Sequence, residues 1–86
     1  MGQTMREVTI YSRSGCHLCE VAHQTLVELQ SLKGLESFKI TEVLIDGDVE
    51  LTHKFGEQVP VIHIDGQPHD YFKVDPERFL KAIGQR

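Results

Sequence analysis

The chain has 86 residues, of which 40% are hydrophobic and 26% charged, enough for one globular domain with a compact core. A net charge of -4 argues against a nucleic-acid or anionic-membrane partner, because phosphate binding depends on clustered Lys and Arg and the nine basic residues here are scattered. No run approaches the roughly eighteen consecutive apolar residues of a membrane span, and the N-terminus lacks an apolar signal core. We therefore expect a single domain over residues 1–86, a cytoplasmic location, no membrane contact and a monomer.

A strand and a long helix are predicted first. Val8 to Tyr11 is a β-branched and aromatic run, typical of a strand buried on both faces, and Ser12-Arg13-Ser14-Gly15 is the turn that follows. From Cys16 to about Leu32, apolar side chains recur every three or four residues, which predicts a helix with one face on the core and an end at Gly34. The positions on this face are Leu18, Val21, Ala22, Thr25, Leu26, Leu29 and Leu32.

A second strand and a short helix complete the first half of the chain. Phe38 to Ile45 is rich in strand formers. It ends at Asp46-Gly47-Asp48, whose carboxylates can cap a brief helix that runs through Phe55, with Gly56 behind it. Strand and helix thus alternate twice.

The second half begins with a hairpin. Val61-Ile62-His63-Ile64 is followed by Asp65-Gly66, a pair suited to a two-residue turn, and then by an extended run through Phe72. Pro68 cannot donate a ladder hydrogen bond, so the second strand of this hairpin is expected at a sheet edge.

A last helix closes the chain. Asp75-Pro76-Glu77 has the pattern of a cap, a first helical position and a favourable N-terminal charge, and Phe79, Leu80 and Ile83 follow on one face. The predicted order of elements is βαβαββα.

Cys16 and Cys19, the only two cysteines, open the long helix directly after a strand. Residues three apart are neighbours on a helix surface, so a disulfide can close and reopen there. In a reducing compartment such a pair is more often catalytic or metal-binding than structural. A thiol attacks only as thiolate, and the amide groups and dipole at a helix start favour a negative sulfur at Cys16 but not one turn further in. We predict that Cys16 attacks a disulfide and that Cys19 resolves the mixed disulfide.

Neighbouring residues have a functional and an ordinary interpretation. A partly protonated His17 can stabilise the thiolate, or it is an exposed turn histidine. Leu18 either contacts a molecule that docks over the site or packs inward. Val59-Pro60, before a strand, is in most proteins an ordinary trans bond, whereas a cis bond would turn the Val59 backbone outward to pair with an extended substrate.

Three segments together resemble the glutaredoxin branch of the thioredoxin-fold superfamily: Tyr11-Ser12-Arg13-Ser14-Gly15-Cys16-His17-Leu18-Cys19, Gln58-Val59-Pro60-Val61-Ile62 and Asp65-Gly66. The chain is most similar to short glutaredoxin-like proteins with a Cys-His-Leu-Cys site, from Val8 to Ile83. The resemblance implies an α/β, thioredoxin-like fold with a four-stranded mixed sheet flanked by three helices, and thiol-disulfide exchange as the activity. It also implies a cis Val59-Pro60 bond that faces Cys16, no tightly bound cofactor, and glutathione as co-substrate.

The resemblance also assigns residues to glutathione. Arg13 matches the basic residue three before the first cysteine that contacts a glutathione carboxylate, and Val59 matches the backbone partner of the glutathione cysteine. The glutathione-binding residues implied are Arg13, Leu18, Val59, Pro60 and Asp75. The alternatives are a solvated loop charge for Arg13 and a helix cap for Asp75.

The chain also departs from typical glutaredoxins. His17 and Leu18 stand between the cysteines in place of Pro-Tyr, and Phe72-Lys73-Val74-Asp75 stands where a Gly-Gly turn ends in Asp before the last helix. The loss of those glycines removes backbone that could approach a ligand closely.

Two other functions remain possible. A zinc or iron-sulfur carrier could use the cysteine pair with His17 or His23, but a closed zinc site usually needs four ligands and there is no second cysteine pair, so no metal residues are assigned. A cluster shared between two chains stays open. A thioredoxin-fold binding module without turnover is the other alternative. The preferred function is an enzyme, a thiol-disulfide oxidoreductase whose partner is glutathione or a protein disulfide or dithiol.

Overall fold

A computed structural model describes residues 6–33 and 38–84. The elements follow the expected order, and the predicted helix end at Gly34 lies outside the described residues. They are β1 (Arg6–Ser12), α1 (His17–Lys33), β2 (Phe38–Leu44), α2 (Val49–Phe55), β3 (Val61–Ile64), β4 (Gln67–Tyr71) and α3 (Pro76–Gly84). No helix in this part of the chain is long and apolar enough to cross a membrane.

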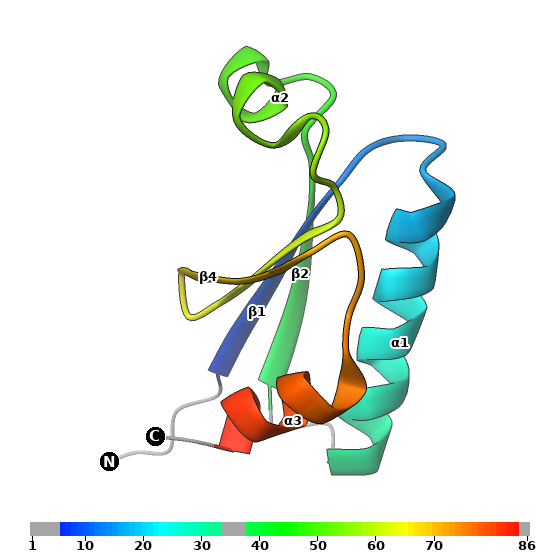
Figure 1. The fold of residues 1–86 in the computed structure, drawn as a ribbon, viewed down its shortest axis with the longest axis vertical. Helices are drawn as coiled ribbons and strands as arrows, with labels where there is room; N and C mark the ends of the chain where they lie inside the picture. Colours follow the sequence, from blue (N-terminus) through cyan, green and yellow to red (C-terminus); the bar gives the residue numbers. More distant parts are fainter. Residues whose placement is uncertain (1–5, 34–37, 85–86) are drawn as a thin grey trace.

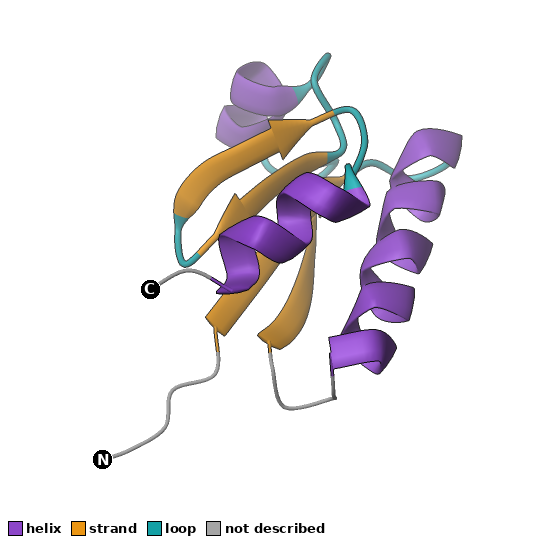
Figure 2. Cartoon of the chain, turned by 60° about the horizontal axis from the view of Figure 1, so that its bottom comes forward, coloured by secondary structure: helices purple, strands orange, loops and turns teal. Residues whose placement is uncertain are grey.

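The four strands form one mixed sheet in the order β2-β1-β3-β4. β1 pairs with β2 in parallel and with β3 antiparallel, and β3 pairs antiparallel with β4. Pro68 therefore lies on an edge strand, as predicted. Figures 1 and 2 show α1 and α3 on the same side of the sheet, while α2 lies beyond the end of the sheet where β1 leads into α1.

The main core lies between the sheet and the helices α1 and α3. Alternate residues of β1 are buried, which directs Val8 and Ile10 to this side. The rings of Phe38 and Phe79 meet edge to face at 5.2 Å between centroids. Each fully buried apolar side chain contributes about 1.5–3 kcal/mol. The buried members of this core are Val8, Ile10, Ala22, Leu26, Leu29, Phe38, Ile62, Ile64, Phe79 and Ile83.

The predicted core face of α1 was too wide. Leu18, Val21 and Leu32 are 53%, 48% and 77% exposed. The buried stripe is narrower, because the helix meets the sheet along one line only and residues on either side of that line point past it. The stripe consists of Cys19, Ala22, Leu26 and Leu29.

The Asp65-Gly66 hairpin is confirmed, and its turn is tied to the start of β1. Asp65 and Gly66 have φ values of 52° and 82°, the positive angles of the predicted turn. The Asp65 carboxylate accepts hydrogen bonds from the Glu7 amide at 2.9 Å and the Arg6 Nε at 2.6 Å. The Glu7 amide, with the Arg6 side chain second, holds the pKa of Asp65 below its usual value.

The strand β4 ends at Tyr71, one residue before the predicted end. Phe72 has a φ of 71°, and its amide donates to the Pro60 carbonyl at 2.7 Å. The Lys73 amide donates to the Tyr71 carbonyl at 2.8 Å, which closes a three-residue turn. The chain therefore turns sharply at Phe72 instead of continuing as a strand.

The predicted cap of α3 is confirmed. The Asp75 carboxylate accepts hydrogen bonds from the amides of Glu77 at 3.1 Å and Arg78 at 3.3 Å. These amides would otherwise have no partner in the first turn of the helix. Phe79 and Ile83 are buried beneath this helix as expected.

Candidate functional site

The two cysteines form a disulfide at the start of α1. Their Cα atoms are 5.2 Å apart, a distance typical of disulfides. Cys16 is partly exposed, whereas Cys19 is only 2% exposed. Cys16 is therefore the member of the pair with surface open to a partner molecule, and Cys19 is covered.

Cys16 is the residue that caps α1. The helix begins at His17, one residue later than predicted, and the Cys16 carbonyl accepts from the Glu20 amide at 3.2 Å. The Cys16 sulfur accepts a hydrogen bond from the Cys19 amide, also at 3.2 Å. Side chains at this position satisfy amides that have no partner inside the helix, and the positive end of the helix favours negative charge. On these principles, the groups at the helix start would favour negative charge on the Cys16 sulfur once the disulfide is reduced.

The turn before the cysteines is bound to neighbouring loops. The Ser14 amide donates to both carboxylate oxygens of Asp46, at 3.3 and 3.2 Å, and hydrogen bonds from Ser14 lower the pKa of Asp46. The Arg13 guanidinium donates to the Gly56 carbonyl at 3.0 Å. Arg13 therefore fixes the turn against the end of α2, a role that the sequence analysis did not predict, and its contact with glutathione remains a prediction.

The Val59-Pro60 bond is cis, as the resemblance implied. Val59 belongs to a second buried cluster with Cys19, Ile45, Phe55 and Val61. Cys16 is partly buried against the same cluster, so the fold brings the cis bond and the cysteine pair together from opposite halves of the chain. The pairing of the Val59 backbone with a ligand remains a prediction.

The remaining predicted residues lie at the rim of the site or beyond it. His17 is exposed at the first position of α1, and its effect on the thiolate stays a prediction. Leu18 is exposed, so the inward-packing alternative is wrong. Asp75 caps α3 as described above, which supports the alternative role that the sequence offered for it.

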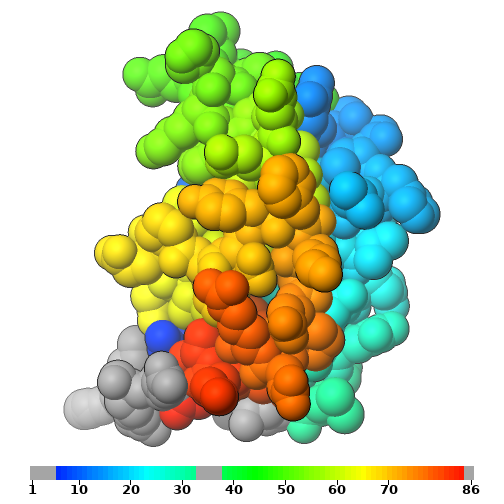
Figure 3. Space-filling model, in the orientation of Figure 1, coloured from blue at the N-terminus to red at the C-terminus, as the bar shows by residue number. Residues whose placement is uncertain are grey.

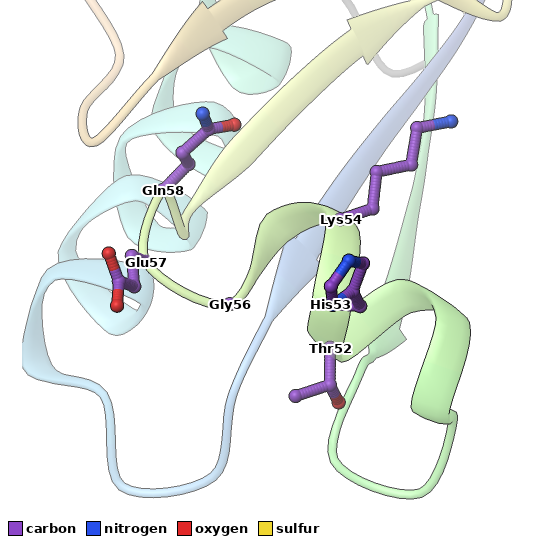
Figure 4. A pocket seen from close by; sticks show the side chains of 6 residues that line it. All are labelled: Thr52, His53, Lys54, Gly56, Glu57 and Gln58. Carbon is purple, nitrogen blue, oxygen red and sulfur yellow. The ribbon is translucent and has the colours of Figure 1, made fainter.

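A hollow of about 460 Å³ lies where α2 ends and the chain leads to Val59. Figure 4 shows Glu57 and Gln58 on one side of it and His53 and Lys54 on the other. Polar side chains predominate among the lining residues, which are Thr52, His53, Lys54, Gly56, Glu57 and Gln58. Gln58 directly precedes the cis Val59-Pro60 bond in the chain, so the hollow borders the segment that carries this bond.

An aromatic cluster that the sequence analysis missed supports the sheet near the site. The Tyr11 ring lies 4.7 Å from that of Phe55 and 5.1 Å from that of His63, and the Lys54 amine is 5.4 Å from the Phe55 ring. Partial burial, followed by the charge of Lys54, lowers the pKa of His63. The only sign of this cluster in the sequence is Tyr11, an aromatic residue in a strand whose side chains alternate between the two faces of the sheet.

Over residues 6–33 and 38–84, no group of three or more His, Cys, Asp and Glu side chains is arranged to hold a metal ion. The described residues therefore give no support to a metal site with three or more protein ligands.

Comparison with known proteins agrees with this geometry. Residues 7–84 match the family model described as Glutaredoxin-like domain (DUF836). Uncharacterized proteins of Mycobacterium bovis and Mycobacterium tuberculosis are each 31% identical over 81 residues, covering 92% of this chain and 84% of each relative. The solution structure of protein Ne2328 from Nitrosomonas europaea is 27% identical, with a TM-score of 0.78 and 95% of each chain covered.

The fold extends to more distant proteins. Oxidised thioredoxin from Plasmodium falciparum is 16% identical, with a TM-score of 0.59 over 91% of this chain and 77% of that one, and so shares the fold. Together with the disulfide at the start of α1, this fold suggests a redox function. The chain belongs to the glutaredoxin-like domain family and carries a disulfide-forming cysteine pair on an α/β, thioredoxin-like fold.

Proposed function

We propose that this protein is a thiol-disulfide oxidoreductase in which Cys16 is the nucleophile and Cys19 the resolving thiol. The observation that carries the proposal is the Cys16–Cys19 disulfide at the start of α1, in which Cys16 is partly exposed and its sulfur accepts a hydrogen bond from a helix amide. A partly exposed thiol at a helix start, beside a second thiol, is an arrangement suited to disulfide exchange.

The reaction has two exchange steps. The Cys16 thiolate attacks one sulfur of a substrate disulfide, so that a Cys16–substrate disulfide forms and the other substrate sulfur leaves as a thiolate and takes up a proton. Cys19 then loses its proton and attacks the Cys16 sulfur, which closes the Cys16–Cys19 disulfide and releases the second substrate thiolate. Two electrons pass from the protein dithiol to the substrate, and an external thiol must return them. Run in reverse, the same steps oxidise a dithiol.

The two sulfurs have surroundings that suit these roles. The Cys19 amide donates to the Cys16 sulfur, which favours the charged form of the attacking group. Cys19 is buried among Ile45, Val59 and Val61. An apolar environment favours the neutral thiol, which loses its proton only in the second exchange step. The short distance between the Cα atoms allows the second step without movement of the helix.

Kinetics of the reduced protein with 2-hydroxyethyl disulfide would test this function. We expect wild-type protein to release two thiols per protein molecule, Cys19→Ser to release one, and Cys16→Ser to release none. Reduction by Cys16→Ser at the wild-type rate would overturn the assignment of the nucleophile, and failure of wild-type protein to react would overturn the activity.

We further propose glutathione as the thiol that returns the electrons. Its support is the position of Val59 beside the cysteine pair and the polar hollow that adjoins this segment. Equilibration of wild-type protein in buffers of reduced and oxidised glutathione, followed by mass spectrometry, should show a Cys16 adduct and a dithiol-disulfide midpoint within the buffered range. An absence of both would exclude glutathione and leave another thiol as reductant.

A further inference from the structure

Four large apolar side chains are exposed on the first turns of α1, where the disulfide lies, and at the end of β4, and we call them the apolar rim. Leu18 and Val21 lie on the first turns of α1 and are 53% and 48% exposed. Tyr71 and Phe72 lie at the end of β4 and are 44% and 51% exposed. Figures 1 and 2 both show the connection from β4 to α3 running beside α1, and Figure 3 shows the two segments in contact on one face.

Phe72 is held in the rim by its backbone. Its φ of 71° is a conformation that bulky residues rarely adopt, and its amide donates to the Pro60 carbonyl at 2.7 Å. The neighbouring Val59 belongs to the cluster against which Cys16 packs. The backbone of Phe72 is therefore held against the segment whose Val59 packs with the cysteines, and a constrained residue of this kind near a reactive group is the basis for a binding role.

A polypeptide substrate must cover part of this rim. The substrate sulfur must reach Cys16, so any polypeptide that carries it passes over the side chains next to Cys16. Covering exposed apolar side chains lowers the free energy of binding only when the covering group is apolar too. Leu32, which is 77% exposed, lies about four helical turns along α1 from Leu18 and therefore apart from the cysteines.

We infer that the apolar rim selects protein disulfides in which a bulky apolar residue adjoins the cysteine that Cys16 attacks, with Phe72 as the main specificity-determining contact. The inference rests on the proposed oxidoreductase function and names its substrate class. The exchange step is the one given above, and two electrons pass from the Cys16–Cys19 dithiol to the peptide disulfide.

Single-turnover kinetics with matched peptides would test the inference. Two synthetic peptides of equal net charge carry one cysteine in a mixed disulfide with the same chromophoric thiol, and differ only in whether that cysteine is flanked by Phe or by Ser. A third probe carries the same chromophore on 2-mercaptoethanol. Each rate with the reduced protein is divided by the rate of the same probe with dithiothreitol, which removes intrinsic reactivity.

We expect wild-type protein to prefer the Phe peptide over the Ser peptide by about tenfold, because part of an aromatic side chain becomes buried on binding. Phe72→Asn should reduce this preference to nearly one, and Asn is chosen because it tolerates positive φ and so preserves the turn. Leu18→Gln, on an exposed helix position, should reduce the preference by severalfold. Leu32→Gln is the matched control and should keep the wild-type preference.

The outcomes separate the two proposals. If the small probe and both peptides react but without preference, or if the preference survives in Phe72→Asn, the inference is overturned and the oxidoreductase function stands. If wild-type protein reduces none of the three probes, the function fails and the inference fails with it.

Discussion

The first turn of α1 predicts that Cys16 ionises more readily than a free cysteine. The donor to its sulfur is the main-chain amide of Cys19, 3.2 Å away. Cys19→Ser therefore removes the second thiol and keeps the donor, so that Cys16 alone titrates in this variant. The matched variant is Cys16→Ser, in which only the buried thiol of Cys19 remains.

The size of the effect follows from two contributions. A hydrogen bond to a charged group contributes about 1.5–3 kcal/mol, and a charge at a helix N-terminus about 0.3–1 kcal/mol. Their sum is about 2–4 kcal/mol in favour of the thiolate. Because about 1.4 kcal/mol corresponds to tenfold, the acid ionisation constant of Cys16 should rise by roughly 30-fold to several hundredfold. Partial exposure of Cys16 favours the lower end of this range.

Rates of iodoacetamide alkylation across pH, followed by mass spectrometry, would measure the ionisation. In reduced Cys19→Ser the midpoint should lie well below the value of about 8.5 for a free cysteine. In Cys16→Ser alkylation should be slow throughout, because Cys19 is only 2% exposed. A midpoint at or above the free-cysteine value in Cys19→Ser would refute the role assigned to the helix start.

Three further predictions concern stability. Leu26→Ala should lower the free energy of unfolding by about 2–5 kcal/mol, because it leaves a cavity at a fully buried position. Leu32→Ala, at a 77% exposed side chain of the same helix, should change it by less than about 0.5 kcal/mol, and equal losses in urea unfolding would contradict the assigned core face. Asp75→Ala should cost about 0.5–2 kcal/mol in the same assay, since it removes the α3 cap, and unchanged stability would disprove that cap. The Glu7 amide lowers the folded-state pKa of Asp65. The ionised Asp65 side chain therefore stabilises the fold, by at most about 1 kcal/mol at this exposed site. This stabilisation is fully present above the unfolded-state pKa and is lost as the pH falls through the folded-state pKa. Asp65→Asn should therefore be less stable than wild type at neutral pH but not in acid, and a difference that does not change with pH would contradict this linkage.

The order of the elements could be predicted because each one has a local signal. The turn at Asp65-Gly66 needs positive φ at two adjacent positions, and the start of α3 needs a cap at Asp75 followed by a proline. The cysteine pair was recognised in the same way, from a spacing of one helical turn directly after a strand. The residues that make up each of these signals lie close together in the sequence, and the folded chain keeps the local structure that they predict.

The features that were missed depend on contacts between distant residues. Arg13 donates to the carbonyl of Gly56, which is 43 residues away, and no local pattern marks that partner. Phe72 is an aromatic residue of the kind that is common in strands, but its amide donates to the Pro60 carbonyl and the chain turns at this point. Leu18 shares the helical period of the core, and only the line of contact between α1 and the sheet determines that it is exposed. Leu18 and Phe72 are both members of the proposed apolar rim.

Trapping of the exchange intermediate tests the division of roles between the two cysteines most directly. Reduced Cys19→Ser and Cys16→Ser are each mixed with a peptide disulfide, quenched in acid and examined by intact-protein mass spectrometry. A peptide adduct should accumulate on Cys16 in the Cys19→Ser variant, and no adduct should form on Cys19 in the Cys16→Ser variant. Adducts on Cys19, or none in either variant, would contradict the assignment of Cys16 as nucleophile and Cys19 as resolving thiol.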